Sequence, residues 1–88
     1  LDGREMQFLR GGRWTIARFK PALLLSLDDE AMAPFGDKGQ DAFNFLRPLG
    51  YAATKIVDDT IYESEDYSGP GRYTFAPARP PGTAGLTF

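Results

Sequence analysis

The 88-residue sequence contains no cysteine and no histidine. Disulfide bonds, thiolate or imidazole metal sites, and catalytic arrangements such as Ser-His-Asp or Cys-His are therefore excluded. Only carboxylate and carbonyl oxygens remain as metal ligands, and these suit Mg²⁺ or Ca²⁺ rather than Zn²⁺. A chain of this length has room for one domain or part of one, and it buries only about 60–65% of the surface that its unfolded form exposes.

Long apolar runs are absent as well. No run approaches the ~20 residues that a membrane-spanning helix needs, and charged residues begin at Asp2, so there is no signal-peptide pattern. The default expectation is a cytoplasmic protein with no membrane partner. The chain does not begin with Met, and we therefore expect it to be cut from a longer protein.

Charge is slightly negative and unevenly distributed. The formal net charge is −2, which argues against a general nucleic-acid binder. Residues 1–25 hold five basic and two acidic side chains, whereas the remainder holds five basic and ten acidic ones. We interpret this asymmetry as a solvated helix face followed by acidic loops rather than as a phosphate-binding patch, because no aromatic–basic alternation accompanies it.

The N-terminal pattern predicts two short helices. Asp2 can cap the first helix, and Glu5 three residues later completes a pair that resembles a capping box. Gly11-Gly12 predicts a break, since two adjacent glycines cost about 2 kcal/mol relative to alanine in a helix interior. The apolar residues that recur at helical spacing, and that we expect to face inward, are Met6, Leu9, Ile16 and Phe19. Phe8 and Trp14 are expected to pack in the core or an interface.

Beyond Pro21 the pattern alternates between strands and a helix. We expect Leu23–Leu27 to be a strand buried on both faces, because a short apolar run lies between Pro and acids. A loop over 28–39, a helix over 40–47 and a polar turn over 64–71 are predicted. Strands are predicted at Tyr51–Val57, with a short extension at Thr60–Glu63, and at 72–76. A right-handed crossover would make the first two strands parallel. The predicted domain spans 1–76, and the Pro/Gly-rich segment 77–88 is an extended or disordered tail.

Four segments in order resemble the FkbM family of methyltransferases. Residues 2–12 resemble its run of acid-Gly-x-Glu, an apolar residue and then Leu-Arg-Gly, without a gap. Residues 15–21 resemble the family's helix end before a basic-Pro pair, and the strand that begins at Leu23 follows at once. Residues 45–51 resemble its Leu-x-x-Leu-Gly-Tyr helix exit. The resemblance covers about residues 1–57.

This resemblance implies an α/β fold, the C-terminal part of a class I (Rossmann-like), S-adenosylmethionine-dependent methyltransferase. Strands and helices would alternate and end in an antiparallel strand pair. Leu23–Leu27 would be the fifth strand, Tyr51–Val57 the sixth, and 72–76 the antiparallel seventh, inserted beside its neighbours. Members of the family are associated with O-methylation of hydroxyl groups, including those of sugars and secondary metabolites.

The resemblance also implies site residues. Asp2 and Glu5 would border the active site just past the fourth strand, where a carboxylate could accept a hydroxyl proton; the residues alone favour a helix cap. Ser26 and Asp28 would form the substrate-side rim, although the residues alone favour a solvated acidic loop that includes Asp29. The family often has a Glu at the end of the fifth strand, where this chain has Ser26.

The expected function is that of a C-terminal methyltransferase fragment, inactive alone. The glycine-rich turn and the acid that hold the cofactor in the family would precede Leu1. S-adenosylmethionine and a hydroxyl acceptor, a sugar or a secondary metabolite, therefore belong to the complete enzyme, and this chain alone is expected to hold no cofactor. Two alternatives stay open. One is a small non-catalytic α/β binding or interaction module, in which an exposed face or the Leu23–Leu27 edge self-associates or recruits a partner; the other is an unrelated α+β domain.

Overall fold

Glycine and proline keep every element of this chain short. The computed structural model describes residues 3–78. In order, the elements are α1 (Glu5–Gly11), α2 (Arg13–Phe19), β1 (Leu23–Leu27), α3 (Asp29–Met32), η1 (Ala33–Phe35), α4 (Gly39–Leu46), η2 (Arg47–Leu49), β2 (Tyr51–Val57), β3 (Thr60–Glu63) and β4 (Gly71–Pro77). The predicted strands Leu23–Leu27 and Tyr51–Val57 are confirmed with their bounds, and the last strand is one residue longer at each end. The extension predicted at Thr60–Glu63 is instead a separate strand that pairs back on β2. The predicted tail is wrong at Pro77, which belongs to β4, and from residue 79 onward it lies outside the described residues.

The break between α1 and α2 is confirmed at Gly11-Gly12. The Gly12 N–H donates to the Phe8 carbonyl at 2.9 Å, and the Gly12 carbonyl accepts from the Ile16 N–H at 2.9 Å. The chain therefore bends here without losing its backbone hydrogen bonds. The prediction that Phe19 faces inward is wrong, because its side chain is 68% exposed. The helix ends at Phe19, and Lys20 in the left-handed region (φ 50°) turns the chain away from it.

The predicted cap, Asp2, lies outside the described residues. Helix α1 begins at Glu5, and Arg4 occupies the N-cap position without a side-chain hydrogen bond. Gly3 precedes it with φ +84°, and a Cβ at Gly3 would lie 2.0 Å from the Ala31 carbonyl oxygen. The chain thus enters the helix through a left-handed glycine that is pressed against α3, and this approach fixes where the helix can start.

The loop predicted over 28–39 is only partly a loop. It contains α3 and η1, because the Asp28 carboxylate accepts a hydrogen bond from the Glu30 N–H at 2.9 Å and so caps a first turn. Gly36, with φ +76°, ends η1. The Pro and Gly residues that favoured a loop therefore limit the length of these helices without preventing them.

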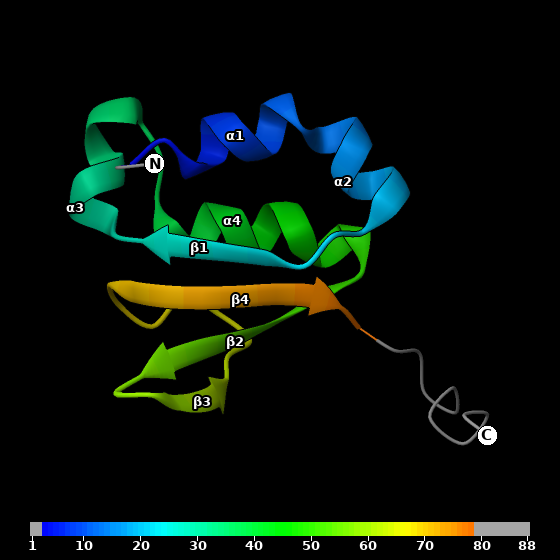
Figure 1. Cartoon of the computed structure of the whole chain (residues 1–88). Helices are drawn as coiled ribbons and strands as arrows, with labels where there is room; N and C mark the ends of the chain where they lie inside the picture. The colour runs from blue at the N-terminus through cyan, green and yellow to red at the C-terminus, as the bar shows by residue number, and fades with distance from the viewer. Residues whose placement is uncertain (1–2, 79–88) are drawn as a thin grey trace, which may run out of the picture.

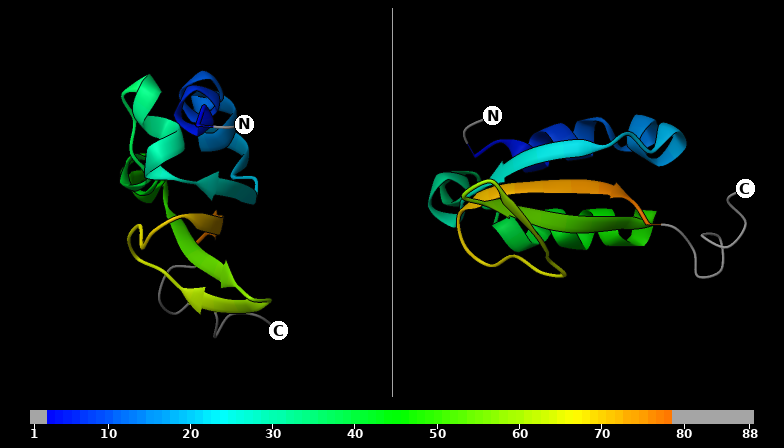
Figure 2. Two further views of the ribbon diagram at one scale, coloured as in Figure 1. Left: turned by 90° about the vertical axis from the view of Figure 1, so that its left-hand side faces the viewer. Right: turned by 60° about the horizontal axis from the view of Figure 1, so that its bottom comes forward.

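The four strands form one sheet in the order β1-β4-β2-β3, and every neighbouring pair is antiparallel. Since β1 and β2 are both antiparallel to β4, they run in the same direction, as predicted, but they are separated by β4. The last strand pairs with β1 and β2, not with β3. The helices gather on one side of this sheet, and α4 connects the β1 region to β2 (Figure 1, Figure 2).

The core lies between that side of the sheet and the helices. Phe43 of α4 makes edge-to-face contacts with Tyr73 and Phe75 of β4, at centroid distances of 5.4 and 5.0 Å. Around them lie the other buried apolar side chains, which include Met6, Leu9, Ile16, Leu25, Leu27, Met32 and Leu46. Aromatic pairs of this kind add about 0.5–1.5 kcal/mol beyond the burial of their surface.

The other face of the sheet is open, so the prediction that Leu23–Leu27 is buried on both faces is wrong. Burial alternates along β1, with Leu25 and Leu27 buried and Leu24 57% exposed. Alternation of this kind is typical of an antiparallel sheet covered on one side. Across the open face, Leu24 lies opposite Thr74, which lies opposite Thr54. The parallel row holds Ser26, Arg72, Ile56 and Ile61.

Phe8 and Trp14 do not pack in the core, and that part of the prediction is wrong as well. Their side chains are 46% and 86% exposed. Helix α2 contributes only Ile16 to the buried set, because its other side chains point away from the sheet and α1. Within residues 3–78, no helix is both long and apolar enough to cross a membrane.

Candidate functional site

The start of α1, the end of β1 and helix α3 meet at one end of the sheet, toward which both β1 and β2 run (Figure 1). The contact between Gly3 and the Ala31 backbone joins these elements. In open, mostly parallel α/β sheets, ligands bind beyond the carboxyl ends of the strands. In this antiparallel sheet the end considered is the one at which β1 and β2 finish. It contains two of the residues predicted from the sequence, Glu5 and Asp28.

Glu5 is the most unusual polar residue at this end. It is only 3% exposed, and its Oε1 is buried without a hydrogen-bond partner among the described residues. A buried carboxyl oxygen without a hydrogen-bond partner costs free energy, so a group that is not part of residues 3–78 would gain by pairing with it. Asp2, the other predicted catalytic residue, lies outside the described residues.

The two predicted rim residues are arranged differently. Asp28 is partly buried and its carboxylate is used by the Glu30 N–H, so its observed role is to cap α3. Ser26 is exposed on the open face opposite Arg72, whereas Glu5 lies on the helix-covered side. The structure therefore does not bring Ser26 and Glu5 together on one face of β1, and no hydrogen bond among the described residues links Glu5 to Asp28.

Asp37 is a second buried acid that the sequence analysis missed. It is 5% exposed, and its Oδ1 accepts a hydrogen bond from Arg10 Nη2 at 2.9 Å. Its Oδ2 is buried without a partner among the described residues. Nothing in the sequence distinguishes Asp37 from the neighbouring acids, because its burial depends on η1 and on the approach of α1.

A cavity of about 420 Å³ adjoins this acid, lined by Asp29, Ala33, Gly36, Asp37 and Lys38. The Asp29 carboxylate accepts from the Gly39 N–H at 2.7 Å, and the Asp29 N–H donates to the Tyr67 hydroxyl at 3.2 Å. Burial raises the pKa of Tyr67, so the phenol stays protonated at neutral pH. Within residues 3–78, no group of three acids is close enough to hold a metal ion.

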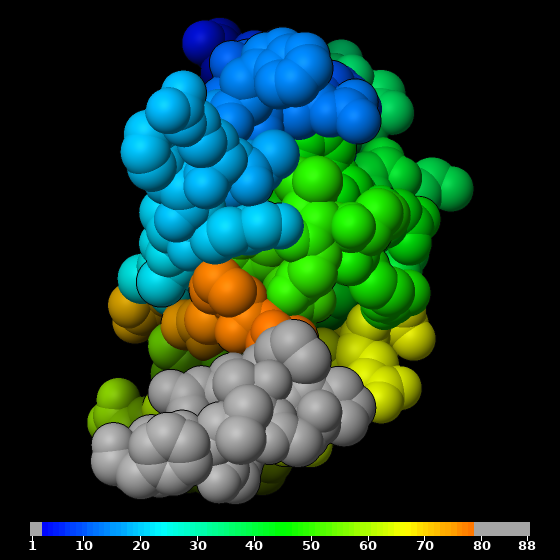
Figure 3. All heavy atoms as spheres, turned by 90° about the vertical axis from the view of Figure 1, so that its right-hand side faces the viewer, coloured from blue at the N-terminus to red at the C-terminus, as the bar shows by residue number. Residues whose placement is uncertain are grey.

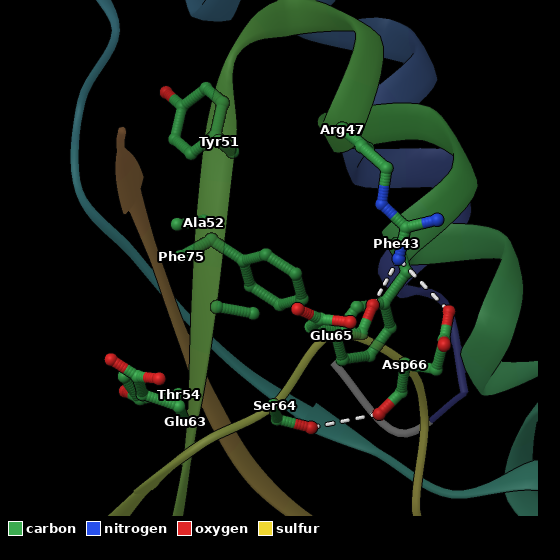
Figure 4. Close-up of a pocket in the computed structure, with 11 residues that line it drawn as sticks. Phe43, Arg47, Tyr51, Ala52, Thr54, Glu63, Ser64, Glu65, Asp66 and Phe75 are labelled. Carbon is green, nitrogen blue, oxygen red and sulfur yellow. Dashed lines mark hydrogen bonds and ion pairs between the residues drawn. The ribbon is translucent and has the colours of Figure 1, made fainter. Parts of the chain in front are cut away.

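A larger cavity of about 630 Å³ lies between α4, β2 and the segment that follows β3 (Figure 4). Phe43 and Phe75 form its apolar floor, and Glu63, Glu65 and Asp66 lie along it. Arg47 donates to the Asp66 carboxylate at 2.9 Å and also to the Glu65 carbonyl. The hydrogen bonds from Arg47 and Gln40 hold the pKa of Asp66 below its usual range.

The larger cavity is separate from the end of the sheet that holds Glu5 and Asp28, since neither residue lines it. None of the residues that line the cavity was predicted as a site residue. The cavity arises where β3 diverges from β2, and only the folded chain brings α4 beside residues 63–66. Its apolar floor and acidic border suit a ligand with an apolar body and a positive charge. A comparison of the chain with family models, curated proteins and solved structures finds no match.

Proposed function

We propose that this chain is the C-terminal part of an FkbM-type, S-adenosylmethionine-dependent methyltransferase that transfers a methyl group to a hydroxyl. The order of the strands carries the proposal. β4 is antiparallel to β1 and β2 and lies between them. The resemblance in the sequence leads one to expect a seventh strand that is antiparallel and inserted beside its neighbours. Residues 1–57 carry the resemblance, so the position of β4 is an independent observation.

The buried Glu5 also supports the proposal. A methyl acceptor hydroxyl must lose its proton, and a carboxyl group can accept it when the two lie within hydrogen-bond distance. Glu5 lies at the strand end where a substrate would bind, and its Oε1 has no partner among residues 3–78. In this proposal Glu5 faces the acceptor hydroxyl in the complete domain, and Asp28 contributes to the rim.

The described residues do not form a site for the methyl donor. A nucleotide-type cofactor binds where a strand passes through a glycine-rich turn into a helix. Here β1 passes through Asp28 into the four-residue α3, and β2 turns back through Asp58-Asp59 into β3. The donor must therefore be bound by other residues, and we propose that residues 3–78 alone are inactive because they cannot hold donor and acceptor in line.

Two uncovered surfaces mark where the rest of the domain would pack. Among residues 3–78, β1 pairs only with β4, so its other edge has backbone groups that no described strand pairs. The open face adds apolar side chains, among which Leu24 is 57% and Ile61 67% exposed. A fourth strand beside β1 and helices on the open face would cover both surfaces.

Complementation tests this proposal. The purified chain is mixed with the separately expressed N-terminal part of an FkbM-type enzyme, which carries the first four strands and the donor site. We expect association and S-adenosylmethionine-dependent methylation of a hydroxyl acceptor. Glu5→Gln should abolish methylation and preserve association, whereas Glu30→Gln, a matched change at an exposed acid, should preserve both. A chain that methylates acceptors alone contradicts the proposal.

The larger cavity favours a second candidate function, a small non-catalytic binding module. It lies away from Glu5 and holds aromatic and charged groups side by side. A module of this kind unfolds cooperatively by itself and does not associate with a methyltransferase half. Cooperative unfolding without complementation would therefore favour the binding module over the enzyme fragment.

A further inference from the structure

One surface at the α2 end of the molecule combines exposed aromatic and basic side chains, which departs from the sequence-based expectation that the basic residues form only a solvated helix face. We define this α2 surface as Arg13, Trp14, Arg18 and Phe19. Trp14 is 86% and Phe19 68% exposed, and both arginines are exposed. Figure 3 shows α2 and the segment after it projecting at the upper part of the molecule. Large apolar side chains gathered at such exposure indicate an interaction surface.

The geometry of α2 keeps these side chains outward. Ile16 is the buried residue of the helix, so Trp14 and Arg18, four residues apart, share the opposite side. The Arg18 guanidinium carbon lies 5.3 Å from the centroid of the Phe19 ring. Lys20 ends the helix and donates to the Leu49 carbonyl, which fixes α2 to the body of the domain. The surface is thus presented by a fixed helix.

Basic and acidic side chains are separated between the N-terminal helices and the rest of the described chain. Residues 3–20 carry five basic and one acidic side chain, and the acid is the buried Glu5; residues 21–78 carry four basic and ten acidic ones. No acid occurs between Met6 and Leu27. Asp58, Asp59 and Glu63 lie at β3, across the sheet from α2 (Figure 1). A negatively charged surface would therefore attract the α2 end and repel the β3 edge.

We propose that the α2 surface docks on an anionic lipid bilayer. Trp14 enters the boundary between headgroups and acyl chains, while Arg18 beside it binds lipid phosphates and Arg13 adds positive charge on one flank of the helix. Phe19 points about 140° away from Trp14 around the helix and does not enter the bilayer with it. A bilayer contacts only one side of the protein, so the acidic β3 edge stays in water, whereas an extended nucleic acid would meet both charges. Neither described cavity is lined by α2, which favours a flat partner over an inserted peptide. The docking is peripheral and needs no spanning helix.

Trp14 is the single tryptophan of the chain, so its fluorescence reports on this surface alone. Vesicles that mix phosphatidylglycerol with phosphatidylcholine are titrated into the protein, with pure phosphatidylcholine vesicles as the control. We expect a blue shift of the Trp14 emission with the anionic vesicles only. Raising the salt from about 0.1 M to about 1 M shortens the screening length from about 10 to about 3 Å and should reverse most of the shift.

Variants assign the effect to the α2 surface. Arg13→Gln/Arg18→Gln should weaken vesicle cosedimentation roughly 25-fold, at about fivefold for each arginine. Lys38→Gln/Arg72→Gln removes the same charge from exposed residues elsewhere and should leave binding within about twofold. Trp14→Ala should weaken cosedimentation, and Tyr62→Ala, at a 54% exposed aromatic on β3, should not.

Three results would overturn the proposal. One is an unshifted Trp14 emission with anionic vesicles while circular dichroism shows the chain folded. Another is equal weakening by the α2 variant and its charge-matched control, which would assign binding to net charge alone. A blue shift that an acidic protein produces and anionic vesicles do not would identify a protein partner and would likewise overturn it. None of these outcomes depends on the methyltransferase proposal, because methylation is not measured.

Discussion

Arg10 and Asp37 form an ion pair of 2.9 Å that joins α1 to the segment before α4, 27 residues later in the chain. The carboxylate is 5% exposed and the arginine 55% exposed, so a largely solvated cation partners a buried anion. The pair fixes the C-terminal end of α1, the helix that begins with Glu5, to the segment before α4. Arg47 and Asp66 form a second pair at the same distance, but both side chains are more than half exposed.

Removing the arginine of each pair should lower the free energy of unfolding by a different amount. Arg10→Ala should lower the free energy of unfolding by about 1–3 kcal/mol, because it leaves the buried Asp37 carboxylate without its partner. Arg47→Ala should change it by no more than about 1 kcal/mol, since its pair is exposed to solvent. Urea unfolding followed by circular dichroism measures both. Equal effects of the two substitutions would contradict the burial assigned to Asp37.

The same substitution, glycine to alanine, should have opposite effects at Gly3 and Gly11. Gly3→Ala should destabilise the fold by at least about 1–3 kcal/mol, because Gly3 has φ +84° and a Cβ would lie 2.0 Å from the Ala31 carbonyl oxygen. Gly11→Ala should stabilise α1 by up to about 1 kcal/mol, because nothing lies within 4 Å of its Cβ position. Urea midpoints of the two variants measure the contrast, and a neutral Gly3→Ala would contradict the described start of α1.

The carboxyl group of Asp66 should titrate below its usual range. Hydrogen bonds from Arg47 and Gln40 to the ionised form lower its pKa in the folded chain. The stabilisation from these bonds is therefore present above the unfolded pKa of an Asp, and it is lost as the pH falls through the lowered folded pKa. Arg47→Gln should raise the pKa of Asp66 toward its ordinary value, as NMR titration of the Asp66 carboxyl carbon can measure. An unchanged pKa would show that Arg47 is not the main cause.

The open face should make the isolated chain self-associate. Leu24 is 57% exposed on β1, which is one of the two edge strands of the sheet in the described residues. Leu24→Lys adds a charge of the kind that natural edge strands use against aggregation, and it should lower the sedimentation coefficient at high protein concentration. Val57→Lys is the control, because Val57 is 41% exposed but belongs to β2, which is paired on both sides. Similar sedimentation of the wild type and Leu24→Lys would contradict this role of the β1 surface.

Much of the local structure could be predicted from the sequence. Gly11-Gly12, Pro21 and the short apolar runs fix the bounds of helices and strands within one or two residues, because backbone propensity acts locally. The burial of β1 was mispredicted, since an apolar run does not specify whether one or both faces are covered. The inward direction of Phe19 was mispredicted because the left-handed Lys20 changes the course of the chain.

The candidate site was less predictable. Glu5 was identified through the family resemblance, and its burial without a partner became evident only in the folded chain. Asp37 and the cavity beside Arg47 depend on contacts between residues far apart in the sequence, so no local pattern announces them. Asp28 differs from these residues, because its observed contact is local. Its carboxylate caps α3 through the Glu30 N–H, although the resemblance placed it at the substrate rim.

The central claim is that the chain holds the acceptor side of a methyltransferase and not the donor site. A thermal melt of the purified chain, followed by circular dichroism with and without S-adenosylmethionine, tests it most directly, because a ligand that binds the folded state must raise its stability. We predict a shallow transition that the cofactor does not move. A sharp transition that S-adenosylmethionine shifts to higher temperature would show that the chain binds the donor by itself, and it would contradict the claim.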